Sequence, residues 1–177
     1  MITTQRLRLI AATIRLLEAD LSGGDALQAE IGVAVPPDWP PELYDEQAMR
    51  YSIHQLQLSP AERGWSFYYF ATNNRLGAPA LVGAGGYKGS PGPDGTVEIG
   101  YSILSRNRRQ GYATEAALGL IEHAFRYPKI QRVTAETYPH LTASIGVLER
   151  CGMSLVGPGS EPGVVRYEVR REERALS

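Results

Sequence analysis

Cysteine, clustered histidines and long apolar runs are what this 177-residue sequence lacks. The single Cys151 cannot form an internal disulfide, which is typical of proteins from a reducing compartment. The histidines at positions 54, 123 and 140 show no ligand spacing, so we expect no metal site. No apolar run approaches the roughly 20 residues of a membrane helix, and the first residues do not resemble a signal peptide. The sequence therefore predicts a cytoplasmic protein that does not associate with membranes.

Net charge is also almost absent, because 18 lysines and arginines are balanced by 19 acidic residues. No overall field would attract nucleic acid, so any basic site must be local. The chain is 43% hydrophobic and 21% charged, which is typical of a globular protein. At this length, folding buries roughly 70% of the unfolded surface, enough for a core without a disulfide or a metal. We expect one domain covering residues 1–177.

Apolar periodicity and turn residues predict a mixed α/β chain. Expected strands cover residues 3–12, 65–72, 80–87, 96–104, 131–137 and 164–170. Expected helices cover residues 13–22, 42–58 and 142–151, and a further helix begins at Tyr112. Residues 32–41 contain Val-Pro-Pro-Asp-Trp-Pro-Pro, which forbids a continuous helix and predicts a loop between helices.

The expected strand at 96–104 and the helix after it each have one apolar face. On the strand, period two places Val97, Ile99, Tyr101 and Ile103 on one face and Glu98, Gly100 and Ser102 on the other. On the helix, the apolar stripe consists of Ala113, Ala116, Ala117, Leu120, Ile121 and Ala124, with Glu115, Glu122 and Arg126 opposite. Small residues in that stripe would let the helix lie close to a sheet.

Three arginines and a glycine lie between this strand and this helix, in the run Arg-Asn-Arg-Arg-Gln-Gly-Tyr-Ala at 106–113. A helix N-terminus has unpaired N–H groups and a partial positive charge, so it attracts anions. Gly111 would let a phosphate approach the backbone closely, and the arginines would add charge. The segment differs from the dinucleotide fingerprint and from the nucleoside-triphosphate loop. It predicts a pyrophosphate site, although a solvated loop with a turn glycine is the simpler alternative.

Two longer segments carry a family resemblance. Val-Glu-Ile-Gly-Tyr-Ser-Ile-Leu-Ser-Arg-Asn-Arg-Arg-Gln-Gly-Tyr-Ala-Thr-Glu-Ala and, further on, Thr-Ala-Ser-Ile-Gly-Val-Leu-Glu-Arg-Cys-Gly-Met resemble the GNAT superfamily of acetyl-CoA-dependent N-acetyltransferases. The similarity is greatest to the Rim-type branch, whose first strand the Gln-Arg-Leu-Arg-Leu segment also resembles. Residues 22–64 carry little of this resemblance.

The resemblance implies the GNAT fold, a mixed and mostly antiparallel sheet, flanked by helices, that splays at a CoA-binding cleft. By similarity, the CoA pyrophosphate would be held by the backbone amides of Arg109, Gln110, Gly111, Tyr112, Ala113 and Thr114, with charge from Arg108 and Arg109. Pantetheine would lie between the strands at 96–104 and 131–137, bonded to main chain near Ile103 and Ser105. A backbone N–H near Ile103 would polarise the thioester carbonyl.

For chemistry, Glu98 resembles the family's strand glutamate, which accepts a proton from the amine directly or through water; otherwise it is an exposed strand carboxylate. His140 is a second candidate base. Tyr101 and Tyr138 fit packing or a substrate wall better than acid catalysis.

Ser144 stands at the serine of the branch's Asn-x-x-Ser and would hydrogen-bond to the leaving thiolate. Its alternative role is that of a helix-surface hydroxyl. Leu141 replaces the Asn, which calls the family's polar contact to pantetheine into question. Cys151 is expected to pack in the interior, because the family transfers the acetyl group directly, without an acyl-enzyme.

The sequence thus predicts an N-acetyltransferase that acts on a protein N-terminus or a small-molecule amine in a ternary complex, as a monomer or homodimer. A CoA-binding module of the same fold without catalysis is the alternative. A nucleic-acid binder would need a wider basic surface with stacking aromatics, which is not apparent. Trp39, Tyr44 and Tyr51 are candidates to line the acceptor pocket.

Overall fold

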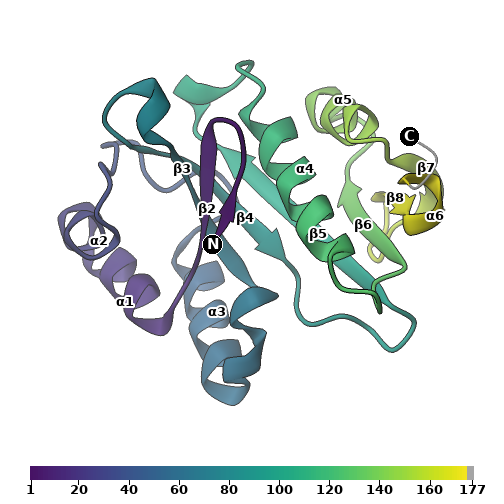
Figure 1. Ribbon diagram of the computed structural model, residues 1–177, viewed down its shortest axis with the longest axis horizontal. Helices are drawn as coiled ribbons and strands as arrows, with labels where there is room; N and C mark the ends of the chain where they lie inside the picture. Colours follow the sequence, from purple (N-terminus) through teal and green to yellow (C-terminus); the bar gives the residue numbers. More distant parts are fainter. Residues whose placement is uncertain (175–177) are drawn as a thin grey trace.

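The computed structural model describes residues 1–174 and contains one eight-stranded sheet (Figure 1). Its strands are β1 (Ile2–Thr3), β2 (Leu7–Ala11), β3 (Phe67–Thr72), β4 (Leu81–Tyr87), β5 (Thr96–Ile103), β6 (Arg132–Thr137), β7 (Ser154–Pro158) and β8 (Val165–Arg170). The α-helices are α1 (Ile14–Ser22), α2 (Gly24–Ile31), α3 (Glu46–Leu58), α4 (Tyr112–Phe125), α5 (Thr142–Arg150) and α6 (Arg171–Arg174). Short 3₁₀ helices are η1 (Pro60–Gly64), η2 (Asn74–Leu76) and η3 (Ser105–Asn107).

The sheet has the order β1-β2-β3-β4-β5-β6-β8-β7, and its neighbours are antiparallel except for β5 and β6. The parallel β5–β6 pair holds only three residue pairs, from Thr96 with Arg132 to Glu98 with Thr134. Beyond Glu98 the two strands are no longer paired. The predicted sheet, mixed, mostly antiparallel and splayed, is confirmed.

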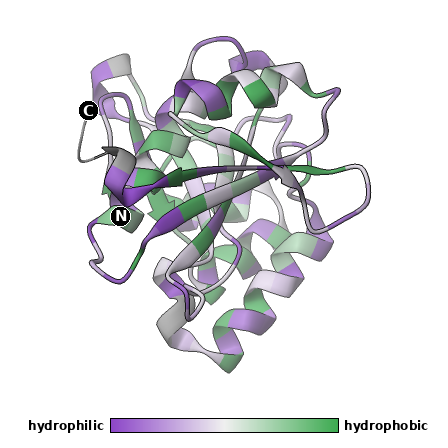
Figure 2. Ribbon diagram, turned by 90° about the vertical axis from the view of Figure 1, so that its right-hand side faces the viewer, coloured by the Kyte–Doolittle hydropathy of each residue, from purple (hydrophilic) through white to green (hydrophobic). Residues whose placement is uncertain are grey.

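Helices cover both faces of the sheet, so the core has two parts, and Figure 2 shows the strands between two helical layers. Strand β3 displays this most clearly, because all six of its residues are buried. Its Tyr68 and Phe70 belong to the core beneath α4, while Phe67, Tyr69 and Ala71 belong to the core beneath α1, α2 and α3. Aromatic residues on both faces suit a strand that is covered from both sides.

Helix α4 lies close to the sheet through its small residues, as its sequence predicts. Five residues of the stripe are fully buried: Ala116, Ala117, Leu120, Ile121 and Ala124. Gly119 permits the closest approach, because a Cβ there would lie 2.9 Å from Cγ2 of Thr4. Any larger side chain would push the β1–β2 hairpin away from the helix.

Two predicted elements need correction, and two observed elements were not predicted. The strand expected at 3–12 is a hairpin, since the chain turns between β1 and β2. Helix α3 begins at Glu46 rather than at residue 42. Asp45 is its N-cap, and the Asp45 carboxylate accepts the N–H of Ala48 (3.0 Å). Helix α2 was not predicted; it buries only Leu27, begins with Gly24 and has Gly23 as its N-cap. Strand β7 was not predicted because it is an exposed edge strand ending in Gly157 and Pro158.

Within residues 1–174, no helix has both the length and the apolar character that crossing a membrane requires.

Candidate active site

The turn that leads into α4 has an unusual backbone conformation. Arg109 (φ 61°) and Gly111 (φ 82°) both lie in the left-handed region, and no side chain caps the first turn of α4. Arg6 donates to the carbonyl of Gln110 (2.9 Å), and the Gln110 side chain donates to the carbonyl of Arg106 (3.1 Å). The first turn of the helix continues through Tyr112, Ala113 and Thr114. These bonds hold the turn in place, and no side chain of residues 1–174 caps the N–H groups at the helix start, an arrangement that fits an anion.

Glu115 stands in the first turn of α4, but its carboxylate faces the β1–β2 hairpin rather than solvent. It accepts bonds of 2.6 Å from the Thr4 hydroxyl, the Arg6 N–H and the Arg6 guanidinium, and its side chain is 15% exposed. Burial opposes its ionisation, but these hydrogen bonds and the Arg6 charge outweigh that cost and lower the pKa of Glu115. Glu115 therefore ties the first turn of α4 to the β1–β2 hairpin, a contact that the sequence did not predict. The Arg6 guanidinium also lies 4.7 Å from the centre of the Tyr112 ring.

Two of the arginines are already paired with carboxylates from the loop between α2 and α3. Arg106 contacts Asp38 (Nη2 to Oδ1, 2.9 Å) and Arg108 contacts Glu42 (Nη2 to Oε2, 2.8 Å). Arg108 also donates from Nε to the carbonyl of Ile103 (3.2 Å). A guanidinium has five N–H donors, and the two contacts of Arg108 use only part of this donor set.

The splay of the sheet leaves one edge of β5 open. Leu104 donates its N–H to the carbonyl of Val82 on β4 (2.9 Å). Because backbone groups alternate along a strand, the N–H groups of Tyr101 and Ile103 face the other way, towards the opening. Ser105 follows at the start of η3 and is exposed. An extended chain with amide groups, such as pantetheine, fits this edge as an added strand would.

Helix α5 borders the same opening. Ser144 lies half-buried in its first turn, where its carbonyl accepts the Tyr101 hydroxyl at 3.5 Å. Burial raises the pKa of Tyr101 above its ordinary value. Leu141 occupies the N-cap position of α5, is 44% exposed and makes no side-chain cap bond. Cys151 is buried against α4, with Sγ 3.7 Å from the carbonyl of Thr114, which fits packing.

His140 and Glu98 lie at different ends of β6. Glu98 is paired in register with Thr134 at the joined end, whereas His140 follows the end of the strand and stacks on Tyr138 with ring centres 5.5 Å apart. His140 is exposed. The structure thus separates the two candidate bases.

Glu98 is half-buried, with its side chain 23% exposed, and forms an ion pair with Lys88. A Cβ on the neighbouring Gly100 would lie 3.7 Å from the Tyr44 hydroxyl, which places Tyr44 beside this part of β5. The sequence analysis did not identify Lys88 as a partner of Glu98. The register of the β4–β5 hairpin could have indicated the pair, because Tyr87 pairs with Ile99, and Lys88 and Glu98 are the next residues towards the turn.

The three aromatic residues expected at the acceptor pocket are not equivalent. Tyr44 packs edge-on against Phe67 (ring centres 5.2 Å apart), and burial raises the pKa of Tyr44. Trp39 packs against Tyr69 at 5.9 Å. Tyr51 is 66% exposed on α3. Tyr44 is therefore the one of the three that the structure brings next to β5.

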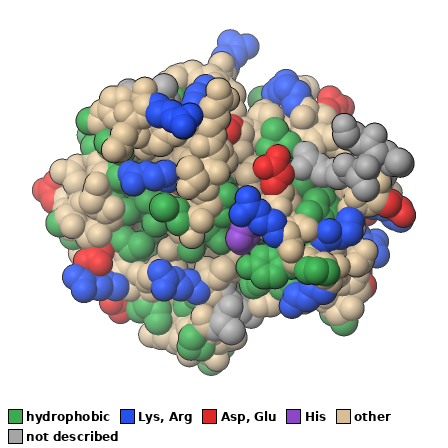
Figure 3. Space-filling view, in the orientation of Figure 1, with side chains coloured by type: hydrophobic (Ala, Val, Ile, Leu, Met, Phe, Trp, Pro, Cys, Tyr) green, Lys and Arg blue, Asp and Glu red, His purple; other side chains and the backbone are tan. Residues whose placement is uncertain are grey.

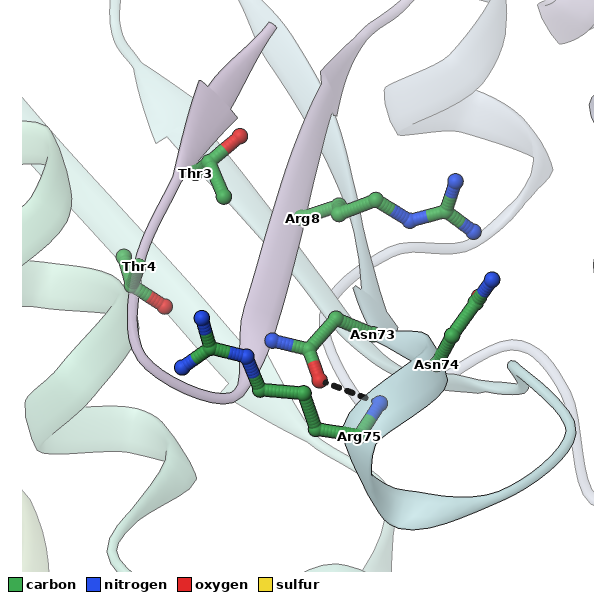
Figure 4. A pocket seen from close by; sticks show the side chains of 6 residues that line it. All are labelled: Thr3, Thr4, Arg8, Asn73, Asn74 and Arg75. Atoms are coloured by element: carbon green, nitrogen blue, oxygen red, sulfur yellow. Dashed lines mark hydrogen bonds between the residues drawn. The ribbon is translucent and has the colours of Figure 1, made fainter.

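A separate hollow of about 310 Å³ lies outside this region, between the β1–β2 hairpin and η2 (Figure 4). Its lining residues are Thr3, Thr4, Arg8, Asn73, Asn74 and Arg75. In Figure 4 the side chains of Arg8 and Arg75 extend in opposite directions, so they do not converge on one anion.

The sequence matches the Acetyltransferase (GNAT) domain family over residues 13–154, and the chain belongs to that family. It is therefore an acyltransferase, as the resemblance predicted. Over 155 residues the chain is 29% identical to the uncharacterized N-acetyltransferase YjdG of Bacillus subtilis, which covers 88% of this chain and 90% of that protein.

Solved structures share the fold at low sequence identity. The acetyltransferase (GNAT family) from Bacillus anthracis matches with a TM-score of 0.64 and 21% identity, over 97% of this chain and 98% of that one. RimL, the ribosomal L7/L12 alpha-N-protein acetyltransferase solved with coenzyme A, matches with a TM-score of 0.64 and 20% identity, over 94% and 95% of the two chains. The fold of the Rim-type branch is thus among those that this chain resembles.

Proposed function

We propose that this protein transfers the acetyl group of acetyl-CoA to a primary amine, on a protein N-terminus or a small molecule, by direct attack in a ternary complex. The observation that carries the proposal is the arrangement of two backbone features: an uncapped start of α4 with left-handed Gly111, and the open edge of β5 next to it. The RimL structure with coenzyme A, which shares the fold, supports this choice of cosubstrate.

The residues that would hold the cosubstrate follow the backbone from the end of β5 into α4. They are Ile103, Ser105, Arg108, Arg109, Gln110, Gly111, Tyr112, Ala113 and Thr114, with Leu141 and Ser144 on the α5 side. Bound acetyl-CoA supplies the acetyl thioester. The N–H of Ile103, directed into the opening, donates to the thioester oxygen and stabilises the negative charge that develops there.

Glu98 accepts the proton that the amine loses, directly or through water. An α-amine with a pKa near 8 is about one-tenth neutral at pH 7, whereas a lysine amine near 10.4 is neutral roughly once in 2,500 molecules. A weak base therefore suffices for an α-amine. The Lys88 ammonium pairs with the Glu98 carboxylate, which favours the ionised form that can accept a proton. The Ser144 hydroxyl donates to the thiolate that leaves.

Two measurements test this function. In a thermal scan, CoA at 100 times its dissociation constant should stabilise the protein by about 2.7 kcal/mol, or roughly 5 to 11 °C for a domain of this size. Release of free thiol from acetyl-CoA is then followed with a panel of α-amines and N-terminal peptides. A protein that shows no thermal shift does not use CoA. A shift without turnover on any amine favours the alternative, a CoA-binding module without catalysis.

The nucleic-acid alternative finds no support on the face shown in Figure 3. There the basic side chains are spread among apolar and acidic ones and form no continuous patch. Binding of nucleic acid relies on many phosphate contacts along one basic surface.

A further inference from the structure

The loop between α2 and α3, residues 33–45, contacts both sides of the candidate active site. Its first part is tied to the sheet: Ala34 donates to the carbonyl of Pro79 (3.0 Å) and accepts from the N–H of Leu81 (2.9 Å). Trp39 donates to Asp20 (2.8 Å). The loop is therefore held by backbone and side-chain bonds along its first half.

The second half of the loop reaches Glu98's side of β5. Tyr44 packs on Phe67 of β3, and its hydroxyl lies above Gly100, two residues from Glu98. A displacement of this part of the loop would therefore change the space beside the proposed base. In the proposed function, that space receives the amine.

Between these anchors, two carboxylates of the loop contact the turn that would bind CoA. Asp38 pairs with Arg106 through two contacts (2.9 and 3.0 Å), and Glu42 pairs with Arg108 (2.8 Å). All four side chains are more than one-third exposed. Ion pairs of this kind are weak and screened by salt, so an incoming phosphate can replace a carboxylate at its arginine.

We propose that Asp38 and Glu42 are positioning residues that couple the CoA site to the amine site through Arg106 and Arg108. They hold the loop, and with it Tyr44, beside Glu98, and they compete with the cosubstrate's phosphates for the same two cations. This inference rests on the proposed function, since it assigns the phosphates to the turn before α4.

The two roles of these carboxylates predict effects of opposite sign. Removing their charge leaves Arg106 and Arg108 free for phosphate and removes a repulsion, so CoA should bind more tightly. The same change releases the loop from the turn, so the amine should bind less well. A contact that served only to stabilise the fold would weaken both substrates together or neither.

The test uses the double variant Asp38→Asn, Glu42→Gln of the whole chain. Calorimetry with CoA should give a dissociation constant lowered about threefold at low ionic strength, an advantage that fades as salt is added. The KM for the amine should rise about threefold or more, with a smaller change in kcat. The control is Glu46→Gln, which removes the carboxylate at the start of α3, directly after the loop, that pairs with Arg50; it should change neither constant.

Exchange of one pair separates coupling from loss of structure. Arg106→Asp and Asp38→Arg should each raise the amine KM, and the two together should restore it, because the ion pair is rebuilt in reverse. Unchanged constants in the double neutral variant, or movement of both constants in the same direction, would overturn the coupling. If the wild-type protein binds no CoA, the proposed function itself fails. Calorimetry on the wild-type protein distinguishes this result from the two outcomes that would overturn only the coupling.

Discussion

The two sides of strand β5 are built by different means. The proposed CoA side is formed by backbone groups. The unpaired edge of β5 after Glu98, the left-handed Gly111 and the start of α4 follow one another along the chain. The proposed acceptor side is made of side chains from three separate segments: Glu98 pairs with Lys88, and Tyr44 lies beside Gly100. A backbone site tolerates most side-chain changes but not a blocked approach, whereas a side-chain site depends on individual groups.

The largest effect should come from blocking the backbone side. Gly111→Asp places a side chain and a negative charge at the start of α4, in a left-handed conformation that glycine favours. We expect CoA affinity to fall by about 100-fold or more, measured by loss of the thermal shift, with the fold retained. Gly111→Ala is the matched variant, which adds strain without charge and should lose less. Normal CoA binding by Gly111→Asp would mean that the phosphates bind elsewhere.

The acceptor side should be sensitive to one functional group. Glu98→Gln keeps the shape of the side chain but cannot accept the proton, so kcat/KM for the amine should fall by about 100-fold while the dissociation constant of CoA stays nearly unchanged. Steady-state kinetics with calorimetry give both quantities. His140→Ala serves as the comparison, because this exposed histidine lies beyond the far end of β6. Should His140→Ala lose activity while Glu98→Gln keeps it, the histidine is the base.

A smaller effect is expected where the two sides meet. Ser144→Ala removes the hydroxyl that would donate to the leaving thiolate, and water can replace it at this half-buried position. Turnover should slow by about tenfold, which corresponds to about 1.4 kcal/mol. Single-turnover kinetics would locate the loss in the chemical step. If Ser144→Ala lost as much activity as Glu98→Gln, the Ser144 hydroxyl would contribute as much to catalysis as the Glu98 carboxylate.

The fold was predictable where local pattern and final burial agree. Alternation marked β5, and small apolar residues at helical spacing marked α4, because both elements bury one regular face. Prediction failed for α2, which buries a single leucine, and for β7, which has no buried face. The β1–β2 turn was missed because Thr4 and Arg6 are fixed by Glu115, more than one hundred positions away.

The candidate site divides in the same way. The turn proposed to bind phosphate was predicted from a contiguous run of residues, since its geometry is that of the backbone. The ion pairs of Arg106 with Asp38 and of Arg108 with Glu42 could not, because nothing local in residues 33–45 indicates which surface they will face. Lys88 falls between these cases, since hairpin register alone could have placed it beside Glu98.

The short junction between β5 and β6 has a mechanical consequence. Three residue pairs and a bond from the Thr134 hydroxyl to the carbonyl of Val97 (3.3 Å) join the two halves of the sheet, whereas β6 and β8 share six pairs. A rotation about this junction widens the opening without breaking the ladder of either half. What resists such a rotation is the buried core on the α4 face of the sheet, which contains residues of both halves of the sheet. Helix α4 packs on β5 and on α5 in this core, so the helix that follows the proposed phosphate turn also links the two halves.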